Sequence, residues 1–465
     1  MKHSLFQVRG VIEGFYGVFY TFPERNDLIR FIGRHGYNVY IYGPKNDRQH
    51  RARWREPYPD QIMDQFAQTV AIAQEAGVTF CYAISPIAST PAQDFERLTA
   101  KLRSFFDIGV RAFCILLDDL VCEEQYEANR KIYNGFAGPH VEICNRLNDW
   151  LQAQDSTCTV RACPTEYYGK PPFSDYLHTL GEGLDPRIDL FYTGPKICSP
   201  EISRSDAEDF GRVAGRAPLI WDNYPVNDLD MKPEMHIGPI RGRDASLYQA
   251  VKGFVVNPML QAEASKLPLL TFADYFADPH GYEPWASWQR ALRAIGGETG
   301  FESLSLFAEN SLRSCLDTVE APALEALVRD AVKALQRGEK ASTSQAVKDL
   351  ESYINKLDEA CYFLKNGMTN LPLRANLLPW IEALEDWIWV GKRAILVLQR
   401  LETGEQYEQP FRWMEHSADE IRKHTKRIAG NSLLTLIQYV VEQVEQRERA
   451  RVEAAGEQAG RSLAA

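Results

Sequence analysis

The chain contains 465 residues, 45% of them hydrophobic, and its 63 acidic and 52 basic side chains give a net charge of −11. This length suits two or three domains, since a domain commonly holds about 150 residues and a barrel about 250. The acidic balance argues against nucleic acid or an anionic membrane as a partner, because both require a basic surface. No apolar run reaches the roughly 18 residues that a membrane-spanning helix needs, so we expect no membrane partner.

The nine cysteines are scattered, without a CxxC pair or a zinc-binding spacing with histidine. This pattern predicts buried, reduced thiols. The first 17 residues lack the apolar segment of a signal peptide, so we expect a cytoplasmic protein. The histidines form no HExxH or other ligand spacing, and the sequence holds no GxSxG elbow and no P-loop. We therefore expect neither a metal ion nor a cofactor.

Up to about residue 280, short β-branched and aromatic runs alternate with stretches of helical periodicity, which are clear over 60–76, 95–106 and 141–154. Alternation of this kind predicts βα units around parallel strands. An open doubly wound sheet is the alternative to a closed barrel, but no GxGxxG follows the first strand. We therefore predict a (β/α)8 TIM barrel over residues 1–282. Its eight strands are expected at 8–13, 38–43, 79–85, 112–117, 159–164, 188–193, 218–222 and 253–256.

Beyond residue 285 the strand signals end, and helical periodicity continues over 322–336, 344–365, 379–401 and 432–454. The sequence thus predicts an all-α helical bundle over 283–465. Pro322 and Pro379 are expected in first helical turns, and Gly404 just past a helix end.

Five apolar side chains share one face of the helix expected at 379–401. They either pack in the core of the bundle or form a subunit contact, so a homodimer through the helical domain is one hypothesis. The five are Trp380, Ile381, Leu384, Trp387 and Ile388.

The residues that follow the predicted strands are carboxylates, amides, aromatic rings and one lysine. Chemistry in a barrel lies at these carboxyl ends of the strands, and a ring of such polar groups is better explained by a polar ligand than by burial alone. The composition is typical of a sugar site. The candidates are Gly14 and Tyr16 after the first strand, Lys45 after the second, Asp118 and Asp119 after the fourth, Tyr167 after the fifth, Trp221, Asn223 and Asp228 after the seventh, and Asn257 after the eighth.

Asp118 and Asp119 stand out because they follow an apolar run that predicts a buried strand. Like charges side by side should raise the pKa of at least one carboxyl, as a general acid requires. A helix cap beside a solvated partner is the plainer reading of this pair.

Other candidates have plain readings too: Gly14 and Gly17 can serve a turn with positive φ, and Lys45 can pair with Asp47. Tyr16 and Tyr167 can merely line the top of the barrel. Helix caps or turns are the plain reading of Asn223, Asp228 and Asn257.

Several segments at separate strand ends resemble glycoside hydrolase family 84, which contains the O-GlcNAcases and bacterial β-N-acetylglucosaminidases. The resemblance covers residues 8–275 in the expected order, and the TIM barrel of that family agrees with the strand count. Departures around 18–20 and 224–226, and Asn46 where a second aspartate often stands, concern the leaving-group preference. The segments are GVIEGFYG at 10–17, YIYGPKND at 40–47, LLDDL at 116–120, CPTEY at 163–167, YTGPK at 192–196 and IWDNYPVND at 220–228.

The resemblance implies a retaining mechanism in which the 2-acetamido oxygen of the substrate attacks the anomeric carbon and forms an oxazoline, so that no protein nucleophile is needed. By this resemblance Asp118 orients and polarises the acetamido group. Asp119 protonates the departing oxygen and then activates water.

The same resemblance assigns the remaining candidates to the sugar. The acetamido pocket receives Tyr167, with Trp221 in its wall, and Asn223 supports both the acetamido group and Asp118. Asp228 is expected on the distal hydroxyls, with Gly14, Lys45 and Asn257 on the others and Tyr16 as a neighbour of the pocket.

The resulting expectation is an exo-β-N-acetylglucosaminidase that acts on β-linked GlcNAc glycoconjugates, O-GlcNAc proteins among them. Three alternatives stay open: a hexosaminidase of glycan fragments, a hyaluronidase-like endo-glycosidase, and a sugar-binding module on an inactive barrel. The presence of both Asp118 and Asp119 argues against the last.

Overall fold

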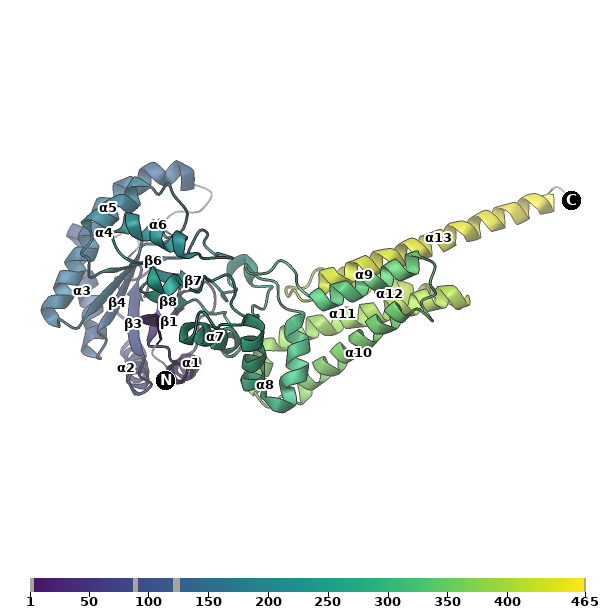
Figure 1. The fold of residues 1–465 in the computed structure, drawn as a ribbon, viewed down its shortest axis with the longest axis horizontal. Coiled ribbons are helices and arrows are strands. Elements are labelled where there is room, and N and C mark those ends of the chain that lie inside the picture. The colour runs from purple at the N-terminus through teal and green to yellow at the C-terminus, as the bar shows by residue number, and fades with distance from the viewer. Residues whose placement is uncertain (1–3, 87–90, 120–125, 464–465) are drawn as a thin grey trace. The chain divides into compact units, whose positions relative to one another are not determined.

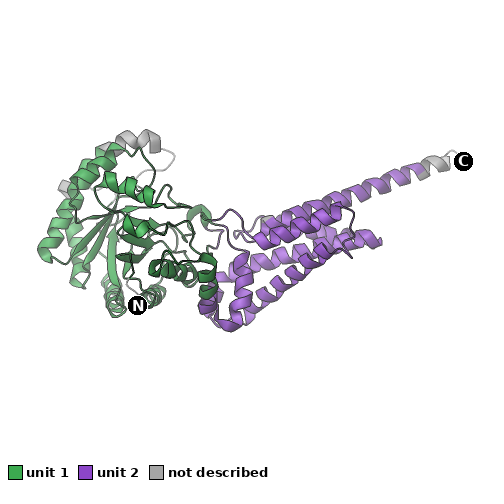
Figure 2. Ribbon diagram, in the orientation of Figure 1, with its two compact units in different colours: residues 1–231, 236–291, 314–316 green, residues 232–235, 292–313, 317–465 purple. Residues whose placement is uncertain are grey.

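The computed structural model describes residues 4–86, 91–119 and 126–463 (Figure 1). Contacts divide the chain into two compact units (Figure 2). Unit 1 comprises Met1–Met231, His236–Ala291 and Ser314–Leu316, and unit 2 comprises Lys232–Met235, Leu292–Arg313 and Asp317–Ala465. The boundary that we expect between domains at residue 282 stays a prediction, since compact units are not a test of independent folding. Among the described residues, no helix combines the length and the apolar character needed to cross a membrane.

Unit 1 contains eight parallel strands that close into a barrel in chain order, and β1 pairs with β8 through Val8 and Gly253. The predicted TIM barrel is therefore confirmed, with each predicted range exceeding the observed strand by at most one residue at either end. The strands are β1(Val8–Glu13), β2(Val39–Tyr42), β3(Thr79–Ile84), β4(Ala112–Leu116), β5(Thr159–Cys163), β6(Asp189–Tyr192), β7(Leu219–Asp222) and β8(Gly253–Val256).

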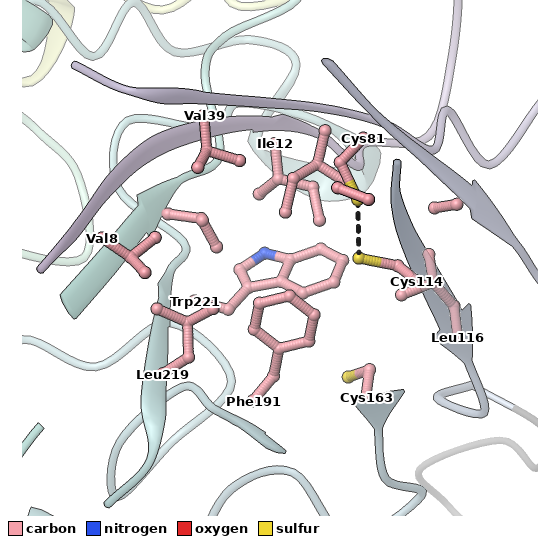
Figure 3. Packing of buried hydrophobic residues seen from close by; sticks show 14 of the residues in the cluster. Val8, Ile12, Val39, Cys81, Cys114, Leu116, Cys163, Phe191, Leu219 and Trp221 are labelled. Atoms are coloured by element: carbon pink, nitrogen blue, oxygen red, sulfur yellow. Dashed lines mark hydrogen bonds between the residues drawn. The ribbon is translucent and has the colours of Figure 1, made fainter. Parts of the chain in front are cut away.

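The interior of the barrel is filled by inward-pointing side chains from every strand, at alternate positions such as Val39 and Ile41 (Figure 3). The Trp221 indole packs edge-on against the Phe191 ring, with 5.5 Å between the centroids. The thiols of Cys81 and Cys114 lie 3.3 Å apart, both fully buried. Most described cysteines are buried as predicted, but Cys198 and Cys315 are only half-buried, and Cys122 lies outside the described residues.

Helices cover the strands of the barrel (Figure 1). The three predicted helices are confirmed, although the helix expected from residue 141 begins at Tyr126 and contains Pro139. The helices are α1(Phe22–Arg34), α2(Asp60–Glu75), α3(Pro91–Asp107), α4(Tyr126–Gln154), α5(Asp175–Gly183), α6(Arg204–Ala214) and α7(Ala262–Ala277), with short 3-10 turns η2(Leu229–Met231) and η3(Leu247–Gln249).

The described part of unit 2 is helical, as predicted. Pro322 lies in the first turn of α9 and Gly404 caps α11 with φ 77°. The expectation for Pro379 was wrong: α11 begins at Leu371, where the Asn370 side chain accepts a hydrogen bond from the Leu373 amide, and Pro379 lies inside the helix. The helices after the barrel are α8(Pro284–Glu309), α9(Pro322–Gln336), α10(Gln345–Asn366), α11(Leu371–Thr403), α12(Glu408–Ile421) and α13(Gly430–Leu463).

The apolar stripe of α11 is buried within unit 2 of a single chain. Trp380 and Ile381 are almost fully covered, and the Trp380 indole donates to the Pro233 carbonyl at 2.8 Å. Leu384, Trp387 and Ile388 are buried as well. The stripe therefore belongs to the core of unit 2, and the homodimer stays a prediction without support from these residues.

A buried ion pair anchors the loop that follows β1. Arg25 donates to both carboxylate oxygens of Glu13, at 2.7 and 3.0 Å, and to the Tyr20 carbonyl at 2.7 Å. Glu13 also accepts from the Tyr40 hydroxyl at 2.6 Å and from the Tyr20 amide at 3.0 Å. The two ends of the segment 13–20 are thereby held on one carboxylate, and this segment carries Gly14 and Tyr16 to the mouth of the barrel.

Replacing Arg25 with methionine should leave the Glu13 carboxylate buried without its cation. Because both side chains are almost completely buried, we expect the free energy of unfolding to fall by about 3–5 kcal/mol. Urea unfolding followed by intrinsic fluorescence measures this loss.

The matched control is Arg53→Met, which removes an arginine from the exposed pair with Glu56, where both side chains are nearly half exposed. An exposed pair contributes about 0–1 kcal/mol. Similar losses in the two variants would contradict the anchoring role of Arg25.

Candidate active site

A cavity of about 780 Å³ opens at the carboxyl ends of the barrel strands, within unit 1. All ten residues that the sequence nominates line it. They are Gly14, Tyr16, Lys45, Asp118, Asp119, Tyr167, Trp221, Asn223, Asp228 and Asn257.

Lys45 lies at the floor of this cavity between the two adjacent aspartates. Its ammonium forms an ion pair with Oδ2 of Asp118 and lies 3.7 Å from Oδ2 of Asp119. The ammonium also lies 5.7 Å from the centre of the Trp221 ring. The plain reading of the sequence, a pair between Lys45 and Asp47, was wrong: the Tyr42 hydroxyl donates to Asp47 at 2.7 Å.

Asp118 is only 4% exposed, and its second carboxylate oxygen is unsatisfied. Among the residues that the structure describes, Oδ1 has no hydrogen-bond partner. A buried polar atom without a partner costs free energy. This oxygen therefore marks a position where a ligand donor would be bound favourably.

Asp119 reaches the same cavity because the backbone turns sharply after β4. Successive side chains of an extended strand point to opposite faces, but β4 ends at Leu116, and Asp119 has a φ of 52°. Its carboxylate accepts a hydrogen bond from the Tyr16 hydroxyl at 2.8 Å and from the Tyr167 hydroxyl at 3.0 Å. Left-handed backbone at a non-glycine residue costs free energy and is concentrated at functional sites.

The two carboxyl groups differ in their affinity for a proton. Burial raises the pKa of Asp118, with Lys45 opposing the shift and Asp119 adding to it. Burial acts in the same sense on Asp119, but Lys45 together with the Tyr16 and Tyr167 hydroxyls outweighs it and lowers the pKa of Asp119. The rise in pKa that the sequence predicts for at least one carboxyl falls on Asp118, and burial contributes more to it than the charge of Asp119.

Burial opposes the charged form of Lys45, but Asp118 and Asp119 outweigh it, so the pKa of Lys45 lies above its usual range. Burial beside Asp119 raises the pKa of Tyr16 to about 12. Lysine therefore stays a cation and tyrosine a neutral donor at neutral pH.

The opposite wall is held by amide hydrogen bonds. Oδ1 of Asn223 accepts from the Trp221 indole at 2.9 Å and from the Asn257 amide at 2.9 Å, while the Asn223 amide donates to the Ile197 carbonyl at 2.9 Å. These contacts fix the indole and both asparagines.

Two further candidates are held by their backbone surroundings. The Tyr16 amide donates to Oδ2 of Asp228 at 2.7 Å, which ties the loop after β1 to the loop after β7. Gly14 does not have the positive φ that the plain reading supposed; Gly17 does, at 119°. Gly14 is instead required by space, because a Cβ there would lie 2.5 Å from the Trp221 ring.

Arg51 is a part of this site that the sequence reasoning missed. It donates to the Tyr16 hydroxyl at 2.7 Å and to the Asp119 carbonyl at 3.2 Å. No spacing rule singles out an arginine in the loop after β2. The rim, which includes Tyr168, Lys196 and Leu229, was missed for the same reason. Over residues 4–86, 91–119 and 126–463, no three histidine, cysteine, aspartate or glutamate side chains gather to hold a metal ion.

Comparison with known proteins agrees with this geometry. Residues 9–309 match the family model described as beta-N-acetylglucosaminidase. Protein O-GlcNAcase of Rattus norvegicus is 35% identical over 275 residues, and so is that of Mus musculus; in each case the match covers 57% of this chain and 30% of the relative. The chain thus spans less than a third of the length of these curated relatives.

Two solved structures are similar over almost the whole chain. A mutant of the O-GlcNAc hydrolase of Thermobaculum terrenum is 30% identical, covers 97% of both chains and has a TM-score of 0.88. The structure of CpGH84B is 28% identical with a TM-score of 0.82, covering 95% of this chain and 77% of that one.

The barrel with a carboxylate-lined mouth is the architecture of a glycoside hydrolase. Because the family model matches well over half of it, the chain belongs to the β-N-acetylglucosaminidase family. The family that the sequence motifs resemble, and the class of glycoside hydrolase, are thereby confirmed.

Gly14→Ala should displace the Trp221 indole, because the new methyl group would lie within 3 Å of two ring carbons. Because the Phe191 ring packs against the indole inside the barrel, we expect the indole to move toward the cavity. Binding of GlcNAc, measured by calorimetry, should then weaken about tenfold or more, which corresponds to a loss of about 1.4 kcal/mol. Gly138→Ala is the control, because nothing lies within 4 Å of its Cβ position. Equal affinities for the two variants would show that the close packing at Gly14 does not shape the site.

Proposed function

We propose that the protein is a retaining exo-β-N-acetylglucosaminidase in which the substrate supplies the nucleophile through its 2-acetamido oxygen. The observation that carries the proposal is Asp118: a buried carboxylate with one oxygen paired to Lys45 and the other without a partner among the described residues. An acetamido N–H group would satisfy that oxygen. Hydrogen bonding to a carboxylate also orients the amide and stabilises positive charge on its nitrogen.

The chemistry then proceeds in two steps. The acetamido oxygen forms a bond to the anomeric carbon while the bond to the aglycone breaks, and Asp119 gives its proton to the departing oxygen. In the second step water attacks the anomeric carbon of the protonated oxazoline, whose N–H has stayed on Asp118. Asp119 takes a proton from that water, and the bond between the acetamido oxygen and the anomeric carbon breaks, which restores the acetamide. Two inversions at one carbon retain its configuration, and no protein nucleophile is required.

This assignment needs a proton on Asp119 in the first step, although the pKa of Asp119 is lowered in the free protein. Two carboxyl groups this close titrate as a pair. Burial raises the pKa of Asp118 in the free site, so a proton bound by the pair favours Asp118 over Asp119. An amide N–H bonded to Asp118 favours its ionised form, and the charge on Asp118 then favours protonation of Asp119. Substrate binding therefore raises the proton affinity of Asp119, which is the residue that has to donate the proton.

The other residues serve the sugar. Tyr167 and Trp221 bound the acetamido group, and Asp228 accepts from the distal hydroxyls. Gly14, Lys45 and Asn257 contact the remaining hydroxyls. The resemblance implied that Asn223 supports the acetamido group and Asp118. Its side-chain oxygen instead accepts hydrogen bonds from Trp221 and Asn257, so Asn223 acts indirectly by holding these two residues.

The aglycone is proposed to include serine and threonine of O-GlcNAc proteins, since the structural relative over 97% of the chain is an O-GlcNAc hydrolase by name. A glycan-fragment hexosaminidase shares this chemistry, whereas a hyaluronidase-like endo-enzyme would cut within a polymer. Products from an aryl GlcNAc glycoside and from hyaluronan, assayed side by side, separate the exo from the endo activity.

Asp119→Asn should lose most activity on substrates whose leaving group must be protonated as it departs. We expect kcat/KM for phenyl β-GlcNAc to fall about 10²–10⁴-fold, the usual contribution of a general acid. The dinitrophenyl glycoside, whose leaving group departs without a proton, should lose far less. Steady-state kinetics on both substrates measures the difference.

Asp118→Asn provides the contrast, because loss of acetamide polarisation should slow both substrates to a similar extent. Equal losses on the two substrates for Asp119→Asn, or full activity of Asp118→Asn, would remove the corresponding role.

A further inference from the structure

We propose that Arg51 is a positioning residue for Asp119 and acts through the Tyr16 hydroxyl. The inference rests on the proposed function, in which Asp119 is the acid and base. Arg51 is not among the residues that line the cavity, so it is placed to position Asp119 rather than to contact a substrate.

The hydrogen bonds of Arg51 dictate the direction of the Tyr16 proton. A guanidinium group can only donate, and a phenol has a single proton. Because Arg51 donates to the Tyr16 oxygen at 2.7 Å, the Tyr16 proton is available to Asp119, whose Oδ2 lies 2.8 Å away. Tyr16 is thereby fixed as a donor to Asp119.

The position of the guanidinium is fixed by a second bond. Its other nitrogen donates to the Asp119 carbonyl at 3.2 Å, next to the left-handed backbone of that residue. The Arg51 amide donates to the Asp47 carbonyl at 3.2 Å, which holds the chain of the loop after β2. The guanidinium therefore cannot shift away from Tyr16 without losing a second partner.

The effect of Arg51 on the proton affinity of Asp119 has to be considered together with the other groups that face this carboxylate. Lys45 and Arg51 approach from the loop after β2, Tyr16 from the loop after β1, Tyr167 from the loop after β5, and Asp118 precedes it in the chain. Arg51 favours the ionised carboxylate by orienting the Tyr16 hydroxyl toward it. It thus sets how readily Asp119 releases a proton to the leaving group and takes one from water.

The test compares three single variants, Arg51→Met, Arg51→Lys and Tyr16→Phe. It adds the double variant that combines Arg51→Met with Tyr16→Phe. Arg51→Met should move the alkaline limb of the kcat/KM profile for phenyl β-GlcNAc to higher pH, because Asp119 then keeps its proton longer. At the optimum, kcat/KM should fall about tenfold, the equivalent of one hydrogen bond to a charged group. In Arg51→Lys the alkaline limb should move less than in Arg51→Met, since lysine keeps a positively charged donor but cannot make both contacts of the guanidinium.

The combined variant reports the route. If Arg51 acts through Tyr16, the double variant should be no more impaired than Tyr16→Phe alone. If the loss in kcat/KM of the double variant equals the product of the two single losses, Arg51 does not act through Tyr16. If the alkaline limb of Arg51→Met does not move and kcat/KM falls equally on the phenyl and dinitrophenyl substrates, Arg51 has only a structural role. Arg53→Met, an exposed arginine two residues away, is the control that should leave the profile unchanged, and melting temperatures show that the variants are folded.

A measurement without turnover separates this inference from the proposed function. The carboxyl carbon of Asp119, followed by NMR across the pH range in the ligand-free protein, should titrate at higher pH in Arg51→Met than in the parent. If Asp119 failed as the acid but this titration still moved, the proposed function would fail while the link from Arg51 to Asp119 stood. An unmoved titration would overturn the link itself.

Discussion

The site depends on one buried cation between two adjacent carboxylates. Lys45, Asp118 and Asp119 together carry one net negative charge when all are ionised, and burial would make two unneutralised carboxylates prohibitive at this depth. The lysine is closer to Asp118 than to Asp119, so it distinguishes two residues that are chemically identical. One carboxylate is buried and has an oxygen without a partner among the described residues, and the other lies at the cavity surface between two tyrosine hydroxyls.

The barrel brings the side chains of two neighbouring residues, Asp118 and Asp119, into one cavity. Consecutive side chains point apart on a strand, and only the turn at Asp119, with its positive φ, brings both to one cavity. The tyrosines and the arginine that surround Asp119 come from loops after other strands. The buried pair of Glu13 and Arg25 holds the first of these loops, so the geometry around Asp119 depends on an ion pair that does not touch the cavity.

Much of this fold is predictable because a parallel strand buried on both faces reads as a continuous apolar run. That is why all eight strands were found within one residue. Helix starts were less certain: α11 was expected to begin at Pro379, which lies inside the helix, and α4 begins at Tyr126, well before the expected start at residue 141. The site residues were found because chemistry in a barrel gathers at strand ends. Their partners were not, since the pair of Lys45 with Asp118, the fit of Gly14 against Trp221 and the contact of Arg51 with Tyr16 join loops that are distant in sequence.

The central claim is that the acetamido oxygen of the sugar is the nucleophile. Its most direct test is kcat/KM for aryl glycosides that share one leaving group and carry N-acetyl groups with zero to three fluorine atoms. Fluorine withdraws electrons from the amide oxygen, so kcat/KM should fall steeply with each substitution, while inhibition constants of the matching free sugars correct for binding. A rate that is indifferent to fluorination would contradict the account, because the attacking atom would then belong to something other than the substrate.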